Sequence, residues 1–114
     1  MLPQITVGNL RTDRHLLGRP GVFRIDRTTA LGNPFVMRNE AQRDSVCDQF
    51  EAYLPNARKH NRAFRVAFDE LVAAAREQPI TILCWCTPLR CHGHPLKAAI
   101  EQEIQASNRP ARST

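Results

Sequence analysis

The 114-residue sequence contains no apolar run long enough to cross a membrane, and its N-terminus lacks the basic region and apolar stretch of a signal peptide. We therefore expect a cytoplasmic protein without a membrane partner. Aromatic residues are also scarce, with a single Trp and a single Tyr. They give no basic and aromatic platform of the kind on which single-stranded nucleic acid stacks. Nucleic acid is accordingly not favoured as a partner.

The length and the rest of the composition indicate one globular domain. A chain of this length buries a core without disulfide or metal staples. The net charge of +5, from 16 Lys and Arg against 11 Asp and Glu, favours anionic partners such as nucleotides, although a solvated basic surface explains it equally well. Four cysteines in a cytoplasmic chain indicate thiols or metal ligands more than disulfides.

Short apolar segments between turn signals predict strands. These strands are 5–7, 22–25 and a buried one that begins at residue 80. Helices are expected between and after them, which together predicts a small α/β layer structure. A single domain is expected over residues 1–106, followed by a flexible basic tail at 107–114.

Three helices follow from capping residues and apolar periodicity. Asn39 is expected to cap the first, with Gln42 at the third position of a capping box, and the helix is expected to end at Pro55. Asn61 is expected to cap a second helix. Pro95 suits the first turn of a third, whose apolar stripe continues to residue 104.

The stretch from Ile80 to Pro95 concentrates the reactive side chains. It contains three of the four cysteines, the only Trp and two of the four histidines. It passes from a buried strand through a loop to the start of a helix, where ligands of α/β proteins gather. Cys91 lies just before this helix, so we expect it to be the first thiol alkylated. Cys84 and Cys86, on one face of the strand, are expected to react more slowly.

The motifs Asn9-Leu10-Arg11, Gly18-Arg19-Pro20, Leu31-Gly32-Asn33-Pro34-Phe35, Arg43 and Cys84-Trp85-Cys86-x-Pro88-x-x-Cys91-His92-Gly93 occur in this order. They resemble a family of phage and bacterial proteins known as the domain of unknown function 4326, and the similarity extends over nearly the whole chain. It implies a small Rossmann-like three-layer fold with a short, mostly parallel sheet. It also implies a distant similarity to nucleotide-binding groups and, for a phage protein, a location in the host cytoplasm.

The same resemblance makes Arg11, Arg19, Asn33 and Arg43 candidates for ligand contact. The chain departs from the family pattern at His94, where the family is expected to carry an acidic residue. An acid–base or metal role is therefore not transferred to that position.

Three interpretations of the Cys/His segment remain open. Zinc accepts Cys and His, but the candidates all fall within residues 84–94 and form no pair of separate knuckles, so no metal ligand is assigned and no cofactor is expected. In a catalytic site, Cys91 or His92 acts as nucleophile or general base, although no further triad member is recognisable. In a structural role, the cysteines fill the core and the turn only starts the last helix.

The sequence thus predicts that the chain binds a nucleotide or a nucleotide-derived metabolite, with cleavage or transfer left open. Cys91 and His92 are the catalytic candidates. The candidate ligand contacts are Arg11, Arg19, Asn33, Arg43 and Gly93. The alternative is a non-enzymatic phage protein that binds and redirects a host protein, and a zinc- or nucleic-acid-binding module ranks below both. The substrate, the reaction and the oligomeric state do not follow from the sequence.

Overall fold

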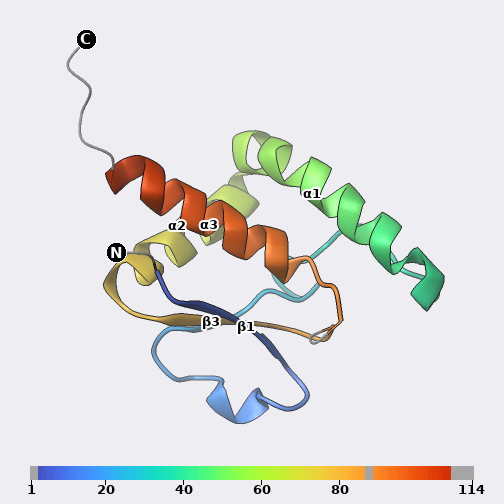
Figure 1. Ribbon diagram of the computed structural model, residues 1–114, viewed down its shortest axis with the longest axis horizontal. Coiled ribbons are helices and arrows are strands. Elements are labelled where there is room, and N and C mark those ends of the chain that lie inside the picture. The colour runs from blue at the N-terminus through green and yellow to red at the C-terminus, as the bar shows by residue number, and fades with distance from the viewer. Residues whose placement is uncertain (1–2, 87–88, 109–114) are drawn as a thin grey trace.

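The computed structural model describes residues 3–86 and 89–108, which form one α/β domain (Figure 1). Its strands are β1 (Ile5–Asn9), β2 (Val22–Arg24) and β3 (Ile80–Cys84). Its α-helices are α1 (Arg43–His60), α2 (Arg62–Glu77) and α3 (Gly93–Asn108), and its short 3-10 helices are η1 (Arg14–Leu16) and η2 (Glu40–Gln42). No helix in the described ranges combines the length and the apolar character that a membrane crossing requires.

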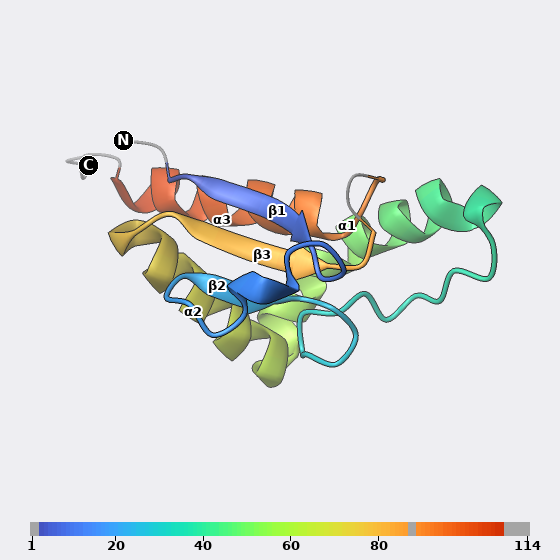
Figure 2. The same cartoon turned by 90° about the horizontal axis from the view of Figure 1, so that it is seen from below.

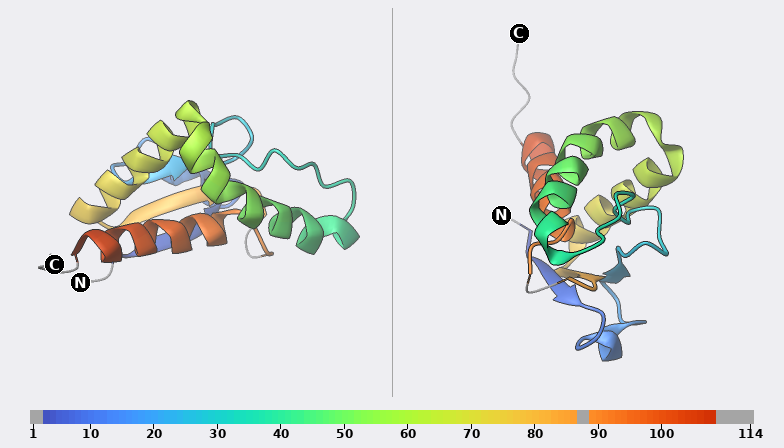
Figure 3. Two further views of the ribbon diagram at one scale, coloured as in Figure 1. Left: turned by 90° about the horizontal axis from the view of Figure 1, so that it is seen from above. Right: turned by 90° about the vertical axis from the view of Figure 1, so that its right-hand side faces the viewer.

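The three strands are parallel and lie in the order β1-β3-β2. Ile5 pairs with Ile80 at one end of the sheet, and Arg24 pairs with Leu83 near the other. Because all strands run the same way, their carboxyl ends meet at one edge, which is where open α/β sheets bind ligands. Figure 3 shows the N-terminal half of α1 extending past this edge.

The helices cover one face of the sheet. Helices α2 and α3 contact each other and both contact β3, and Figure 2 shows the sheet and η1 in front of them. The predicted α/β class and short parallel sheet are confirmed. The layer on the second face is reduced to the β1–β2 connection with η1, because residues 10–21 are too few to cross the sheet and also form a long helix.

Helix α1 continues through Pro55 to His60, so the expected end at Pro55 is wrong. A proline inside a helix removes one backbone hydrogen bond and costs about 3 kcal/mol or more. Pro55 is exposed, whereas Phe50, Leu54 and Ala57 on the same helix are buried in the core. Their burial, at roughly 1.5–3 kcal/mol for each large side chain, outweighs the cost of the proline.

The two expected helix caps have different outcomes. Asn39 precedes η2 rather than α1 and makes no side-chain capping bond. The Gln42 side chain instead accepts a hydrogen bond from the backbone N–H of Arg38 at 2.8 Å. Asn61 caps α2 as predicted, because its Oδ1 accepts from the Phe64 N–H at 3.1 Å.

The C-terminal boundary also differs from the expectation. Helix α3 continues to Asn108, two residues into the segment 107–114 that the sequence assigned to a tail. The rest of that segment, 109–114, lies outside the described residues. The core between the sheet and the helices is centred on Phe50, Phe64 and Phe68, all fully buried.

Candidate functional site

A cavity of about 420 Å³ lies at the carboxyl edge of the sheet. Its wall is built by residues of four segments, 26–28 after β2, the loop 33–37, residues 43–47 of α1 and the Cys/His segment 84–92. Small-molecule sites usually measure about 300–1,000 Å³. The cavity therefore has the size and the position of a small-molecule site.

Asp26 is the most highly connected polar group of this wall. It is only 5% exposed, and its carboxylate accepts hydrogen bonds from Arg24 at 2.7 and 3.2 Å, from the Thr28 hydroxyl at 2.8 Å and from the Trp85 indole N–H at 3.2 Å. Burial raises the pKa of Asp26, but the hydrogen bonds together outweigh it and hold the pKa below its ordinary value. Asp26 is consequently a carboxylate at neutral pH.

Trp85 follows β3 directly and is 49% exposed although it is the only Trp of the chain. Its indole N–H is bonded to Asp26, so the ring has a fixed position in the cavity wall. Alternation along a continuing strand, which puts Cys84 and Cys86 on one face, would place residue 85 on the opposite face. The strand ends at Cys84, and Trp85 instead presents a large aromatic surface to solvent.

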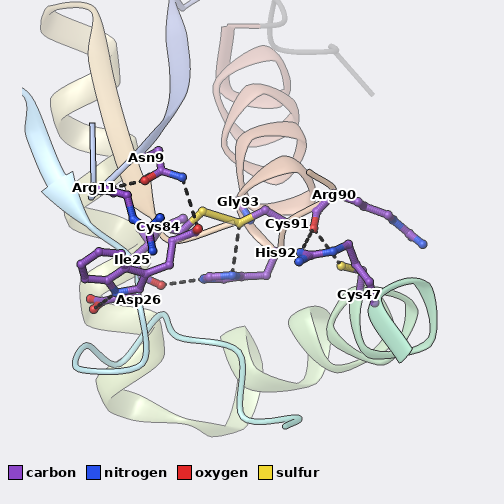
Figure 4. The surroundings of a disulfide bond; sticks show 12 residues. Asn9, Arg11, Ile25, Asp26, Cys47, Cys84, Arg90, Cys91, His92 and Gly93 are labelled. Carbon is purple, nitrogen blue, oxygen red and sulfur yellow. Dashed lines mark hydrogen bonds between the residues drawn. A yellow bond between two sulfur atoms is a disulfide. The ribbon is translucent and has the colours of Figure 1, made fainter. Parts of the chain in front are cut away.

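The sulfur atoms of Cys84, Cys86 and Cys91 lie within 4.8 Å of one another. Cys84 and Cys91 are joined as a disulfide (Figure 4), with Cα atoms 7.7 Å apart. Thiols or metal ligands were expected rather than disulfides, so this pairing is a correction. The cause is topological, because the end of β3 and the start of α3 bring two fully buried cysteines together.

His92 is 7% exposed, and both of its ring nitrogens have neighbours. Nε2 lies 2.6 Å from the Ile25 carbonyl oxygen, which accepts only, so Nε2 carries the proton and Nδ1 has the lone pair. Nδ1 lies 3.6 Å from the Cys91 sulfur (Figure 4). Burial lowers the pKa of His92, and the bond to Ile25 opposes this only in part. The ring is therefore neutral at pH 7.

Two arginines attach the Cys/His segment to α1. Arg43 donates to the Arg90 carbonyl at 2.9 Å and pairs with Glu40 at 2.8 Å. The Arg90 guanidinium contacts three carboxylates of α1, at distances of 2.6 to 3.0 Å. Both positive charges are thus paired. Arg27, in contrast, is exposed and makes no ion pair within the described chain, where it donates to the Phe35 carbonyl at 3.2 Å.

The structure brings together four of the seven residues singled out by the sequence. Asn33, Arg43, Cys91 and His92 line the cavity. Asn33 uses its amide structurally, since it donates to the Val46 carbonyl at 3.3 Å and accepts from the Phe35 N–H at 2.9 Å.

The other three lie outside the cavity wall. Gly93 is buried at the start of α3, where a Cβ atom would come within 2.9 Å of Val7 and 3.0 Å of Ile25. Arg11 and Arg19 are exposed on the β1–β2 connection. Neither arginine is brought to the cavity.

Sequence reasoning missed Asp26, Arg27 and Trp85 as parts of the site. The available signal was their position, because all three come within three residues of the carboxyl end of a strand. Parallel strands place such residues at one edge of the sheet. The register of β2 on β3 decides which of these residues come into contact, and this register is known only from the structure.

Limited alkylation provides a direct test of the thiol environments. Since Cys91 is fully buried and joined to Cys84, we expect the half-buried Cys86 to be alkylated first, reversing the order expected from the sequence. Cys47 is expected to lag, because burial raises the pKa of its thiol. Peptide mapping after brief exposure to iodoacetamide gives the order, and modification of Cys91 first would contradict the observed burial.

Comparison with known proteins identifies a family. A family model described as "Domain of unknown function (DUF4326)" matches residues 8–102, most of the chain. The match agrees with the resemblance carried by the sequence motifs. No curated protein and no solved structure matches the chain, so its chemistry has to be argued from its own residues.

Proposed function

The chain belongs to the family described as a domain of unknown function (DUF4326), and we propose that it binds a nucleotide or a nucleotide-derived metabolite in the cavity at the carboxyl edge of the sheet. The observation that carries the proposal is the pairing of an exposed, fixed Trp85 ring with the exposed Arg27 in one cavity wall. An aromatic face and a guanidinium are the two groups that a base and a phosphate require.

Each part of such a ligand has a partner of matching chemistry. A base stacks on the ring of Trp85, which Asp26 holds in place. A phosphate pairs with Arg27, the wall arginine whose charge no described carboxylate neutralises. Met37 and Val46 add apolar surface to the wall. This division between apolar surface and few polar groups is typical of ligand sites.

The proposal is for binding, and cleavage or transfer is not part of it. Cys91 is joined to Cys84, and Nε2 of His92 is bonded to Ile25. In this state Cys91 has no free thiol to act as a nucleophile, and the remaining lone pair of the buried His92, on Nδ1, lies 3.6 Å from the Cys91 sulfur. We also propose a cytoplasmic location, with which a nucleotide ligand is consistent. For a phage-encoded chain this is the cytoplasm of the host.

Fluorescence of the single Trp gives the test. We expect one member of a panel of nucleotides, NAD and cyclic nucleotides to quench Trp85 on titration. Trp85→Ala is expected to weaken binding roughly 10- to 100-fold, measured by calorimetry, because stacking contributes about 1–3 kcal/mol. Arg27→Ala is expected to weaken it roughly tenfold or more, because it removes a charge-assisted hydrogen bond.

Arg65→Ala is the matched control, since Arg65 is an exposed arginine on α2, outside the cavity wall. It should leave affinity unchanged. Arg11→Ala and Arg19→Ala test the wider sequence hypothesis and should also have little effect. The proposal fails if no ligand of the panel binds, or if Arg27→Ala and Arg65→Ala weaken binding equally.

A protein partner is the second candidate, and one observation favours it. Three of the large apolar side chains exposed among the described residues, Val36, Trp85 and Leu89, line the cavity or are adjacent in sequence to residues of its wall. An apolar rim of this kind is suited to a protein surface. Leu89→Asp separates the two functions, because it should abolish capture of a host protein and leave nucleotide affinity intact. If Leu89→Asp captured the host protein as well as the unmodified chain does, the apolar rim would not be a partner surface.

A further inference from the structure

The three converging sulfurs have the geometry of a metal site. Zinc binds thiolates at about 2.3 Å in a tetrahedron, which places neighbouring sulfurs roughly 3.8 Å apart. Cys84, Cys86 and Cys91 bring their sulfurs within 4.8 Å of one another, so small side-chain rotations are enough to reach that spacing. The Cα atoms of Cys84 and Cys91, 7.7 Å apart, exceed the roughly 7 Å beyond which a disulfide needs backbone movement. The backbone therefore suits an ion between the sulfurs better than a direct bond.

A fourth donor lies beside this cluster. Nδ1 of the buried His92 is 3.6 Å from the Cys91 sulfur, close to the roughly 3.6 Å that separates nitrogen and sulfur ligands around tetrahedral zinc. While Cys91 is joined to Cys84, its sulfur carries no proton, so it cannot donate to the Nδ1 lone pair. The other ring nitrogen donates to the Ile25 carbonyl. Histidines that bind metals commonly donate their second N–H to a backbone carbonyl in this way.

The surroundings also favour thiolates. The backbone N–H of Gly93, at the N-terminus of α3, donates to the Cys91 sulfur at 3.4 Å. The guanidinium of Arg43 lies beside Cys86. Three thiolates around a divalent ion leave one net negative charge, and a helix N-terminus and an arginine both stabilise such a charge.

We propose that the reduced chain binds one zinc-class ion through the thiolates of Cys84, Cys86 and Cys91, with Nδ1 of His92 as the fourth ligand. This revises the expectation from the sequence, which assigned no metal ligand. Binding releases the three thiol protons and changes no oxidation state. From the disulfide form, a thiol or phosphine reductant must first supply two electrons. The site does not depend on which ligand the cavity takes.

The test uses the full chain, reduced with a phosphine that competes little for zinc, and zinc alone as the probe. Native mass spectrometry should show one zinc per chain, and competition against a chromophoric chelator gives the affinity. Cobalt in place of zinc should give the visible absorption of a tetrahedral ion and a thiolate-to-cobalt charge-transfer band. Protons should be released into weakly buffered solution on zinc addition.

Cysteine variants identify the ligands. Cys86→Ser is chosen because Cys86 is half-buried, so the core is least disturbed. It should weaken zinc binding at least about 100-fold, beyond the roughly 10- to 100-fold that loss of a ligand's outer hydrogen-bond partner costs. Cys47→Ser is the matched control, since Cys47 lies outside the sulfur cluster. It should bind zinc like the unmodified chain.

Histidine variants form a second pair. His92→Ala should weaken zinc binding and shift the cobalt spectrum, whereas His94→Ala, an exposed position on α3, should do neither. Circular dichroism of each metal-free variant checks that it is folded. Should one fail to fold, alkylation of the unmodified chain replaces it, and zinc must then slow the modification of Cys86.

Several results would overturn the proposal. The proposal is wrong if the reduced chain binds no zinc, or if the Cys86→Ser variant binds zinc as tightly as the Cys47→Ser variant does. Alkylation of Cys86 at the same rate with and without zinc would count equally against it. If His92→Ala and His94→Ala gave the same affinity and cobalt spectrum, the assignment of His92 as the fourth ligand would be wrong.

Discussion

Asp26→Ala is expected to lower the free energy of unfolding by about 3 kcal/mol, measured by urea denaturation. The substitution leaves the hydrogen-bonding groups of Arg24, Thr28 and Trp85 without their acceptor. Removing one partner of a buried ion pair costs roughly 3–5 kcal/mol. The lower end applies here because Arg24 is 36% exposed and regains water. The emission of Trp85 should shift as its indole loses the bond to Asp26.

Asp26→Asn is the control, because it keeps the shape and removes the charge. The folded-state pKa of Asp26 lies below its ordinary value of 3.8, so its contribution to stability is complete above that value and is lost as the pH falls through the folded pKa. The stability difference between the unmodified chain and Asp26→Asn should therefore narrow below about pH 4. A constant difference across that range would show that the charge of Asp26 contributes nothing.

Phe50→Ala is expected to cost about 4 kcal/mol of unfolding free energy, within the roughly 3–5 kcal/mol typical of Phe→Ala in a core. Phe50 is fully buried, and its ring centroid lies 5.1 Å from that of His92, with the two rings nearly perpendicular. The cavity left by the substitution should also loosen His92. We therefore expect Phe50→Ala to weaken zinc binding in the chelator competition, as well as to lower the denaturation midpoint.

Phe68→Ala separates the two effects of Phe50→Ala. Phe68 is equally buried, but its ring stacks on Phe64 and lies under the Arg58 guanidinium, whereas the ring contact with His92 is made by Phe50. The Phe68→Ala variant should lose about as much unfolding free energy as Phe50→Ala and should keep its zinc affinity. Equal weakening of zinc binding in both variants would mean that Phe50 acts only through general stability.

The elements of the fold were largely predictable because their signals are local. The β-branched run at Ile80 and the Asn61 cap depend on neighbouring residues only, and both lie where they were expected. Pro55 was misjudged because the penalty of a proline is local, while the packing of Phe50 and Leu54 that offsets it is tertiary. The reduced second layer was missed because sheet order is set by pairings between distant residues.

The site was predictable only in part, for the same reason. His92 and Cys91 stand out in the sequence because they share one dense segment. The role of Asp26 depends on Trp85, 59 residues away, and no feature of either residue indicates the other. The convergence of Cys84 and Cys91 likewise depends on how the end of β3 and the start of α3 pack together. Arg11 was a candidate ligand contact only because it lies in a family motif, and it does not line the cavity.

The position of β3 between β1 and β2 has a consequence for synthesis of the chain. The two outer strands do not pair with each other, so residues near Ile5 leave the ribosome long before their partners near Ile80 exist. Until then their backbone groups have no strand to bond, and unpaired strand edges attract other chains. A polypeptide interrupted before Ile80 would lack the central strand, so neither outer strand would have its hydrogen-bonding partner.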